Sequence, residues 1–372
     1  MSDRAPLPHG RPAGGFRVID AGRREGRFNI ALDAAMIELH QSGRIPDTIR
    51  FIHFPPTALV GRHQVLGREL DLDYCRRQGI GTARRVTGGG AIYMDEGQLG
   101  WALVFHRRTL GLAGLGEVAR TICEAVAGGL SRLGVDARYR PRNDIEVDGR
   151  KISGTGGFFD GDTLIYQGTV LLELDPQRML EALRVPASKL ARHGAGSAAQ
   201  RVVTLRELLG DRTPGVAGVQ AALLEGFADR LGLSWQEETV TQEELSLAAQ
   251  HYAEEIGTDA FVAEIDEPTD AAAWSQGKHD CPGGAITAFV RREGSPANRI
   301  GQVLFTGDFF VAPPRVVLDL EASLKGLAIA QAGPAVEGFF AERELAALSV
   351  APADFRKALE EALGTSAREE SR

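Results

Sequence analysis

The order of extended and amphipathic segments restricts the fold of this chain more than any other feature. Residues 15–21 and 99–105 predict strands, while residues 28–39 and 118–133 carry apolar side chains three and four residues apart, the spacing of one helix face. Residues 163–172 (TLIYQGTVLL) predict a further long strand. A doubly wound parallel sheet requires regular alternation of strand and helix, which this order lacks. We therefore expect an α+β fold built on a mixed sheet.

Between residues 136 and 172 the sequence predicts hairpins. Ile145–Val147 and Ile152–Ser153 are expected to pair across the turn DGRK, whose last residue is Lys151. Further helices are expected at 69–77, 202–209, 219–231, 317–324 and 352–363, and further strands at 48–60 (interrupted by Pro55 and Pro56), 82–86, 91–93, 284–290 and 299–305.

The chain of 372 residues is long enough for two domains. Residues 257–278 contain Pro268 and several acidic residues and predict loose structure. The first fifteen residues are rich in proline and glycine and predict a flexible tail rather than a signal peptide. The expected organisation is a tail at 1–15, a larger domain at 16–262, a linker at 263–278 and a small domain at 279–372.

Composition excludes several classes of protein. The net charge of −8 and the lack of a long basic run argue against a nucleic-acid-binding protein. No apolar run is long enough to span a bilayer. Cys75, Cys123 and Cys281 are far apart and predict neither a disulfide framework nor a zinc site. We expect a monomer in the reducing cytoplasm, without nucleic-acid or membrane partners.

The strongest local signal is RRVTGGGAIYMD at residues 84–95, where three glycines join two extended segments. Because glycine has no Cβ atom, these backbone N–H groups can approach a phosphate or a carboxylate closely. Arg84 and Arg85 are expected to supply positive charge at the entrance, and Thr87 a hydroxyl group. The alternative interpretation is a tight turn or bulge between two strands. The segment is neither a GxxxxGK[ST] phosphate loop nor a GxGxxG dinucleotide fingerprint.

Lys151 lies in a second glycine-rich segment, RNDIEVDGRKISGTGGFFDGDTLIYQGT at residues 142–169. It is the first of five lysines in a chain with 37 arginines (42 basic residues minus 5 lysines). Just upstream, Asn143 and Asp144 could anchor a metal ion or a hydroxyl group. Alone, this segment also fits a solvated hairpin with exposed charges. Together with the three glycines, it favours a site for an anion.

Other residues give weaker signals. The sequence has no HExxH motif or other paired metal spacing, and no GxSxG motif of a serine hydrolase. His63, in GRHQ, is expected in the core or on the surface rather than against a ligand. Cys75 and Cys123 are expected to be structural, since no cysteine lies beside a candidate base.

The glycine-rich segments resemble the lipoate–protein ligase A family of the biotin/lipoate protein ligase superfamily. Residues 84–101 (RRVTGGGAIYMDEGQLGW) look like its RRxSGGGxVxHDxGN motif, and residues 142–156 (RNDIEVDGRKISGTG) look like RNDLxxxGRKxSGSA. Residues 166–175 resemble its HGTLLLxxD strand, and residues 284–326 its small accessory domain. The resemblance implies a mixed-sheet biotin/lipoate ligase-like catalytic domain followed by a small α+β C-terminal accessory domain.

The resemblance implies a two-step reaction. Lipoate and ATP, with Mg²⁺, give lipoyl-AMP and pyrophosphate, and the lipoyl group then passes to a lysine of an acceptor protein. The implied acceptors are the acyltransferase subunit of a 2-oxoacid dehydrogenase, the glycine-cleavage H protein or a specialised lipoate-binding protein.

The resemblance also implies the site residues. The catalytic residue is Lys151, Asp144 is a candidate ligand of Mg²⁺, and residues 194–205 close over the adenylate. The nucleotide or adenylate contacts Arg85, Gly90, Ala91, Ile92, Tyr93, Asn143, Asp144, Lys151 and Thr169. The lipoate contacts Thr87, Gly88, Gly89, Lys151, Gly154 and Gly168.

The residue types agree with this chemistry. A carboxylate that attacks an α-phosphate brings two anions together, so the site must neutralise charge and align both groups. Lysine is a compact cation on a flexible stem and suits this task better than the planar fork of arginine. Pyrophosphate is a stable leaving group, so the reaction needs no histidine as general acid. The sequence names no base for the acceptor lysine.

Three residues depart from the family pattern. Met94 and Gln98 replace a histidine and an asparagine, and Gln167 stands where the family often has histidine. These departures leave open the acceptor and the preference for lipoate or octanoate.

Three other functions are alternatives to the ligase. One is an octanoyl- or lipoyl-transferase of the same fold that forms a cysteine thioester, but residues 135–143 contain no cysteine. A biotin–protein ligase is disfavoured because GRGRxGR-type loops are missing. A non-catalytic lipoate-binding relative is the alternative outside the enzymes.

Overall fold

The computed structural model describes residues 15–364 except 113, 185–200, 269, 271, 282–283, 344–345 and 349. The strands of its main sheet are β1 Gly15–Arg23, β2 Thr48–His53, β6 Gln98–His106, β7 Arg138–Arg140, β8 Asp144–Val147, β9 Arg150–Asp160, β10 Thr163–Leu171 and β11 Ser234–Glu238. Their order is β11-β1-β2-β6-β10-β9-β8-β7. β1 pairs in parallel with β11 and β2, and the pairs from β2 to β7 are antiparallel. The sheet is mixed, which confirms the α+β prediction.

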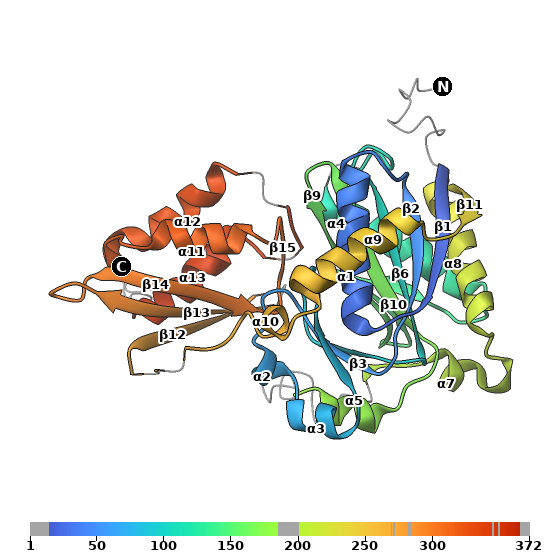
Figure 1. Cartoon of the computed structure of the whole chain (residues 1–372), viewed down its shortest axis with the longest axis horizontal. Helices are drawn as coiled ribbons and strands as arrows, with labels where there is room; N and C mark the ends of the chain where they lie inside the picture. Colours follow the sequence, from blue (N-terminus) through green and yellow to red (C-terminus); the bar gives the residue numbers. More distant parts are fainter. Residues whose placement is uncertain are drawn as a thin grey trace.

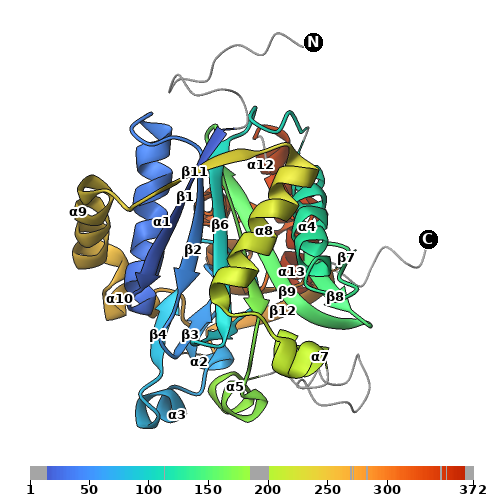
Figure 2. The ribbon, with the colours of Figure 1, turned by 90° about the vertical axis from the view of Figure 1, so that its right-hand side faces the viewer.

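Helices cover both faces of this sheet. The helices of the chain are α1 Gly26–Gln41, α2 Leu66–Glu69, α3 Leu72–Arg77, α4 Leu115–Ser131, α5 Pro176–Ala182, α7 Leu205–Leu209, α8 Val216–Leu231, α9 Gln242–His251, α10 Asp259–Val262, α11 Val316–Leu324, α12 Ala332–Ala341 and α13 Pro352–Leu363. Figure 2 shows α1 and α9 on one side of the strands and α4 and α8 on the other. Each layer encloses its own buried apolar cluster, because side chains alternate across a strand.

A second sheet carries the three glycines. Its strands are β3 Thr57–Val60, β4 Gly81–Arg84 and β5 Ile92–Met94, in the order β4-β3-β5. Pro55 and Pro56 cannot donate ladder hydrogen bonds, so the expected strand at 48–60 ends at His53 and resumes at Thr57 in the other sheet. The glycine segment joins β4 to β5.

The C-terminal residues form a separate layer of sheet and helices, coloured orange to red in Figure 1. Its strands are β12 Trp274–Cys281, β13 Gly284–Glu293, β14 Arg299–Gly307, β15 Phe310–Ala312 and β16 Ala346–Leu348. β12, β13 and β14 form an antiparallel sheet that shares a buried core with α11, α12 and α13. We retain the divisions at 16–262, 263–278 and 279–372 as a proposal. The loose structure expected over 257–278 is wrong for α10 and for the start of β12.

The helix predicted at 202–209 is wrong at its start. Val203 N donates to Lys151 O at 2.9 Å, so this stretch extends beside β9. The helix α7 begins only after Thr204, whose side chain accepts a hydrogen bond from Glu207 N. The strands β7 and β11 and the helices α9 and α12 were not predicted. Residues 1–14 of the expected tail and 194–200 of the expected closing loop lie outside the described residues.

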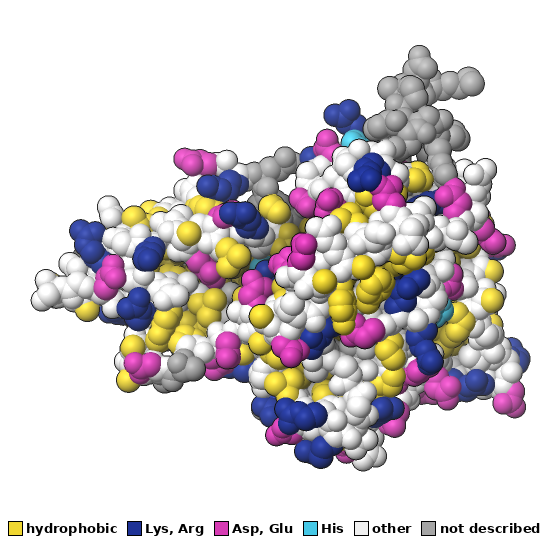
Figure 3. Space-filling view, viewed as in Figure 1, with side chains coloured by type: hydrophobic (Ala, Val, Ile, Leu, Met, Phe, Trp, Pro, Cys, Tyr) yellow, Lys and Arg dark blue, Asp and Glu magenta, His cyan; other side chains and the backbone are white. Residues whose placement is uncertain are grey.

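The surface of the described residues carries charges of both signs (Figure 3). In the described part of the chain, no helix has the length and apolar character needed to cross a membrane. On the face shown in Figure 3, acidic and basic side chains of the described residues are interspersed over both parts of the molecule.

Candidate active site

A cavity of about 490 Å³ lies between the α1 face of the main sheet and the glycine segment. We call it the central pocket. Every residue that the resemblance placed against a ligand lines it, except Gly89. Those lining residues are Arg85, Thr87, Gly88, Gly90, Ala91, Ile92, Tyr93, Asn143, Asp144, Lys151, Gly154, Gly168 and Thr169.

Two glycines of β9 make room for the pocket. A Cβ atom at Gly154 would lie 2.5 Å from Lys151 Nζ, and one at Gly156 would lie 2.2 Å from the ring of Phe310. Both distances are far below ordinary contact, so a side chain at either position would displace a pocket residue. The alternate spacing of these glycines puts both on the same face of the strand.

The glycine segment is shaped by Arg85. Its guanidinium donates to the carbonyl oxygens of Gly90 at 2.8 Å, Gly88 at 3.1 Å and Leu59 at 3.3 Å. Burial, and then the charge of Arg84, lower the pKa of Arg85 to about 10. Within the described residues no carboxylate forms an ion pair with it. A buried cation without an anionic partner is costly, so an anionic ligand in the pocket would be stabilised here.

Arg84 has a different role from the one predicted. It is 1% exposed and lies outside the pocket lining. Its guanidinium donates to the carbonyl oxygens of Gln64 at 2.7 Å and Val262 at 2.8 Å. The prediction of charge at the entrance is therefore wrong for this residue, since adjacent strand residues point to opposite faces. Arg84 instead ties β4 to α10.

Lys151 stands at one end of the pocket with a carboxylate partner. Its Nζ lies 2.7 Å from Asp144 Oδ1, and Arg140 donates to Asp144 Oδ2 at 2.7 Å. Burial alone would raise the pKa of Asp144, but the charges of Lys151 and Arg140 outweigh it and hold the pKa below its usual range. The Lys151 side chain is 38% exposed, so its ammonium can exchange Asp144 for a ligand.

The neighbouring strands fix this end of the pocket. Asn143 donates to the carbonyl oxygen of Thr155 at 2.5 Å, and the Thr155 hydroxyl donates to the carbonyl oxygen of Asn143 at 2.8 Å. The described residues contain no cluster of three His, Cys, Asp or Glu side chains that could hold a metal ion. A single carboxylate is still compatible with Mg²⁺ that arrives on nucleotide phosphates, because this ion keeps most of its water and phosphate ligands. Asp144 fits that limited role.

The other end of the pocket contains two polar residues: Gln167, a departure from the family pattern, and Asp33, which the sequence did not single out. Asp33 of α1 accepts hydrogen bonds from Gln167 Nε2 at 2.9 Å and from Arg50 Nη1 at 2.5 Å. Burial, opposed by Arg50, raises the pKa of Asp33. Met94, one of the departures from the family pattern, is 2% exposed and also lines the pocket. Asp33 lies off the apolar face formed by residues 28, 31, 32, 35, 36 and 39, so the spacing carried no signal for it.

The C-terminal part of the chain completes the wall. Phe309 O accepts a hydrogen bond from Gly89 N at 3.1 Å, and the Phe310 ring lies against Gly89 and Gly156. His63 stacks on Phe309 with ring centroids 4.9 Å apart. His63 is 5% exposed and lies outside the pocket lining, as expected. Burial, with Arg62 and Arg84 adding charge repulsion, lowers its pKa to about 3. No local sequence pattern pointed to Phe310.

Comparisons of the whole chain with known proteins found similar sequences and structures. Residues 25–228, more than half of the 372 residues, match the family described as Lipoyl protein ligase A/B catalytic domain. The octanoyltransferase LipM of Kyrpidia tusciae is 29% identical over 268 residues, which cover 66% of this chain and 97% of the relative.

Two solved structures resemble the same part of the chain. The bipartite lipoate protein ligase of Thermoplasma acidophilum, described with its E2 lipoyl domain, is 27% identical with a TM-score of 0.59 and covers 68% of this chain and 99% of that chain. A crystal structure of lipoate-protein ligase A bound with ATP is 27% identical with a TM-score of 0.59 and covers 68% of this chain and 100% of that chain.

Proposed function

Because this chain belongs to the lipoyl protein ligase A/B catalytic domain family, we propose that it is an ATP-dependent lipoate–protein ligase. The family and the mixed-sheet biotin/lipoate ligase-like fold expected from the sequence are confirmed. The chain is thus an enzyme of the lipoyl and octanoyl transfer class. The proposal adds that it activates lipoate to lipoyl-AMP, releases pyrophosphate and passes the lipoyl group to an acceptor lysine.

One observation carries the proposal: two cations from different parts of the chain line one pocket, and neither is held by a carboxylate that it cannot exchange for a ligand. Arg85 is buried and lacks a carboxylate partner in the described residues, whereas Lys151 is partly exposed and can leave Asp144. A reaction between a carboxylate and a triphosphate requires two such charges. The ATP that the similar lipoate-protein ligase A binds is consistent with this assignment.

The residues suggest how the first step proceeds. Arg85 holds the glycine segment so that its backbone can face the phosphates. The Lys151 ammonium contacts the lipoate carboxylate and the α-phosphate as the new O–P bond forms and the bond to pyrophosphate breaks. Mg²⁺ on the nucleotide would neutralise part of the pyrophosphate charge, and Asp144 is the residue that would hold it. The adenylate is a mixed anhydride, which an unprotonated acceptor lysine can attack.

The acceptor is proposed from a relative. The bipartite ligase of Thermoplasma acidophilum is described with its E2 lipoyl domain, so lipoyl domains of this kind are the first acceptors to test. The H protein of glycine cleavage and specialised lipoate-binding proteins are the others. We also propose a cytoplasmic monomer.

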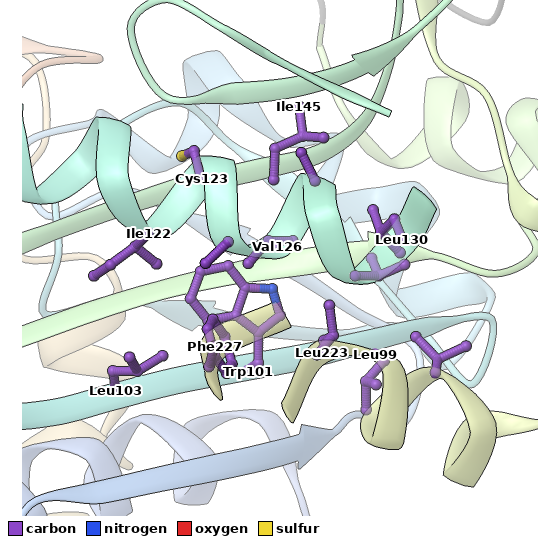
Figure 4. Close-up of a cluster of buried hydrophobic side chains, with 14 of the residues drawn as sticks. Leu99, Trp101, Leu103, Ile122, Cys123, Val126, Leu130, Ile145, Leu223 and Phe227 are labelled. Carbon is purple, nitrogen blue, oxygen red and sulfur yellow. The ribbon is translucent and has the colours of Figure 1, made fainter. Parts of the chain in front are cut away.

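The second candidate function is octanoyl or lipoyl transfer through a cysteine thioester, favoured by the similarity to an octanoyltransferase. Such an enzyme needs a thiolate at its pocket. Cys123 is 0% exposed on α4, among the apolar side chains of Figure 4, and its Sγ lies 3.3 Å from Thr155 Oγ1. Burial raises the pKa of its thiol. Cys75 and Cys281 are also buried, and no cysteine lines the pocket, which supports the ligase.

The test is lipoate-dependent exchange of labelled pyrophosphate into ATP by the purified chain. A ligase catalyses this exchange without an acceptor, and Cys123→Ser is expected to retain it within about twofold, because the thiol does not line the pocket. Failure of the wild-type protein to catalyse exchange, with circular dichroism showing a folded chain, would rule out the ligase. Loss of lipoyl transfer in Cys123→Ser would favour the thioester route.

A further inference from the structure

The position of Gln167 relates it to the far end of a bound acyl chain. Gln167 on β10 is the register partner of Gly156 on β9. The Lys151 ammonium lies over Gly154. Gly154 and Gly156 are two residues apart, which is about 7 Å along a strand. The Phe310 ring covers Gly156, so a chain whose carboxyl end contacts Lys151 runs along β10, whose residues Thr169 and Gln167 line the pocket, and brings its far end to Gln167.

The walls at this end of the pocket are apolar apart from two polar side chains, which are hydrogen-bonded to each other. The apolar lining residues of this part of the pocket are Ile30, Ile52, Phe54, Leu59, Ile92 and Met94. Gln167 and Asp33 are the polar side chains set among them, joined by the hydrogen bond from Nε2 to Oδ2 at 2.9 Å. An acyl tail that fills the space must therefore cover an amide group.

The amide is held in one orientation. Asp33 is buried, and its other oxygen accepts a hydrogen bond from Arg50 Nη1, which is also fully buried. Arg50 in turn donates to the side-chain oxygen of Asn29 at 2.7 Å. This chain of contacts fixes the carboxylate that receives one N–H of Gln167. Within the described residues, the Gln167 side chain makes only that hydrogen bond, so its second N–H has no partner in the protein.

The unpartnered N–H distinguishes between possible acyl tails. An unsubstituted alkyl tail, such as that of octanoate, offers no hydrogen-bond acceptor, so covering the amide costs the full free energy of its hydration. Sulfur is polarisable and accepts weak hydrogen bonds, so a tail that ends in a dithiolane recovers part of this cost. Two chains of equal length therefore differ in affinity at this one residue.

We propose that Gln167, oriented by Asp33, is a specificity-determining residue that makes the pocket prefer a dithiolane-ended acyl chain to a saturated chain of the same length. The inference rests on the proposed function for the identity of the acids. It concerns binding alone and does not depend on how the acid is activated. The expected preference for lipoate over octanoate is about tenfold, the effect of one weak hydrogen bond at a buried amide.

The experiment is calorimetric titration of the full-length protein with lipoate and with octanoate, without nucleotide, in the wild type and in Gln167→Leu. Leucine has a similar volume and needs no hydrogen-bond partner. The wild type is expected to bind lipoate about tenfold more tightly, and Gln167→Leu is expected to bring the two dissociation constants within about twofold, mainly by tighter binding of octanoate.

Thr169→Val is the matched control. Thr169 lies two residues further along the same strand and lines the same pocket. Its substitution by valine also replaces a polar group by an apolar one. It lies nearer the Lys151 end, so its effect should be equal for both acids and the affinity ratio should stay at the wild-type value. Equal wild-type affinities, or an unchanged ratio in Gln167→Leu, would overturn the proposal.

The outcomes also separate this inference from the proposed function. If the wild type prefers lipoate tenfold and Gln167→Leu removes this preference, but the protein shows no pyrophosphate exchange, then Gln167 is a specificity residue and the ligase function is rejected. Normal pyrophosphate exchange with equal affinities for lipoate and octanoate would support the ligase function and reject Gln167 as a specificity residue.

Discussion

Replacing Lys151 by alanine should separate catalysis from stability. The Lys151 side chain is 38% exposed, and an ion pair at that exposure contributes about 0.2–1 kcal/mol to folding. Asp144 also keeps Arg140 as a partner in the variant. We therefore expect the free energy of unfolding to fall by about 1 kcal/mol or less.

The effect on the reaction should be much larger. Removing one charge that stabilises a developing anion costs about 3–4 kcal/mol, or 100- to 1000-fold in rate. Lys151→Ala should therefore lower kcat/KM for lipoate-dependent pyrophosphate exchange by this factor. Lys151→Arg keeps the charge but replaces the compact ammonium by a planar guanidinium, so its activity should lie between those of the wild type and the alanine variant.

Lys278 provides the matched control. It is 40% exposed and pairs with Asp280 at 3.5 Å, and it lies on β12 outside the central pocket. Lys278→Ala should change stability by a similar small amount and leave exchange unchanged. The reasoning is refuted if Lys151→Ala exchanges pyrophosphate at nearly the wild-type rate, or if both lysine variants lose activity equally.

Two further predictions concern the pocket wall and the C-terminal core. Gly156→Ala would place a Cβ atom 2.2 Å from the ring of Phe310, so we expect about tenfold weaker binding of lipoate in calorimetry. An unchanged affinity would show that the pocket wall at Gly156 and Phe310 is not tightly packed. Burial raises the pKa of Glu321 from 4.5 to about 7, so its contribution to stability is present below pH 4.5 and is lost as the pH rises through 7. Glu321→Gln keeps an oxygen that can accept the hydrogen bond from Phe305 N, but its side chain does not titrate. In urea unfolding, the free energy of unfolding of the variant should therefore lack the wild-type decrease, on the order of 3 kcal/mol, between pH 4.5 and 7. Equal pH profiles of the variant and the wild type would contradict this prediction.

The sequence was most informative where the site is local. The two glycine segments and Lys151 each lie in a short continuous motif, so their chemistry could be read without knowing the fold. The fold brings them together, because residues of β9 and of the glycine segment line the same pocket.

Residues that reach the pocket by tertiary packing could not be predicted. Asp33 and Gln167 are 134 positions apart in the chain and meet only when α1 covers the sheet. Phe310 arrives from the C-terminal part, beyond any local pattern of the glycine segment. Arg84 and Arg85 show the same limit, since alternation along a strand predicts that one faces away but not which one.

The errors in secondary structure have a similar origin. Residues 202–204 (Val, Val and Thr) are β-branched and favour extended backbone, so the predicted helix rested on the apolar residues that follow them. Pairing with Lys151 makes them extended, and that partner is 51 positions earlier in the sequence (202 minus 151). The long-range pairing acts in the same direction as this local propensity, whereas the apolar spacing alone favours a helix.

The most direct test of the account is a rapid-quench experiment on the wild-type protein with lipoate and Mg-ATP and without an acceptor. Mass spectrometry of the quenched small molecules and of the intact chain would reveal where the lipoyl group goes. The account predicts lipoyl-AMP in an amount close to that of the protein, with an unmodified chain. A folded protein that forms no lipoyl-AMP, but takes up an acyl group covalently from an acyl thioester, would contradict it.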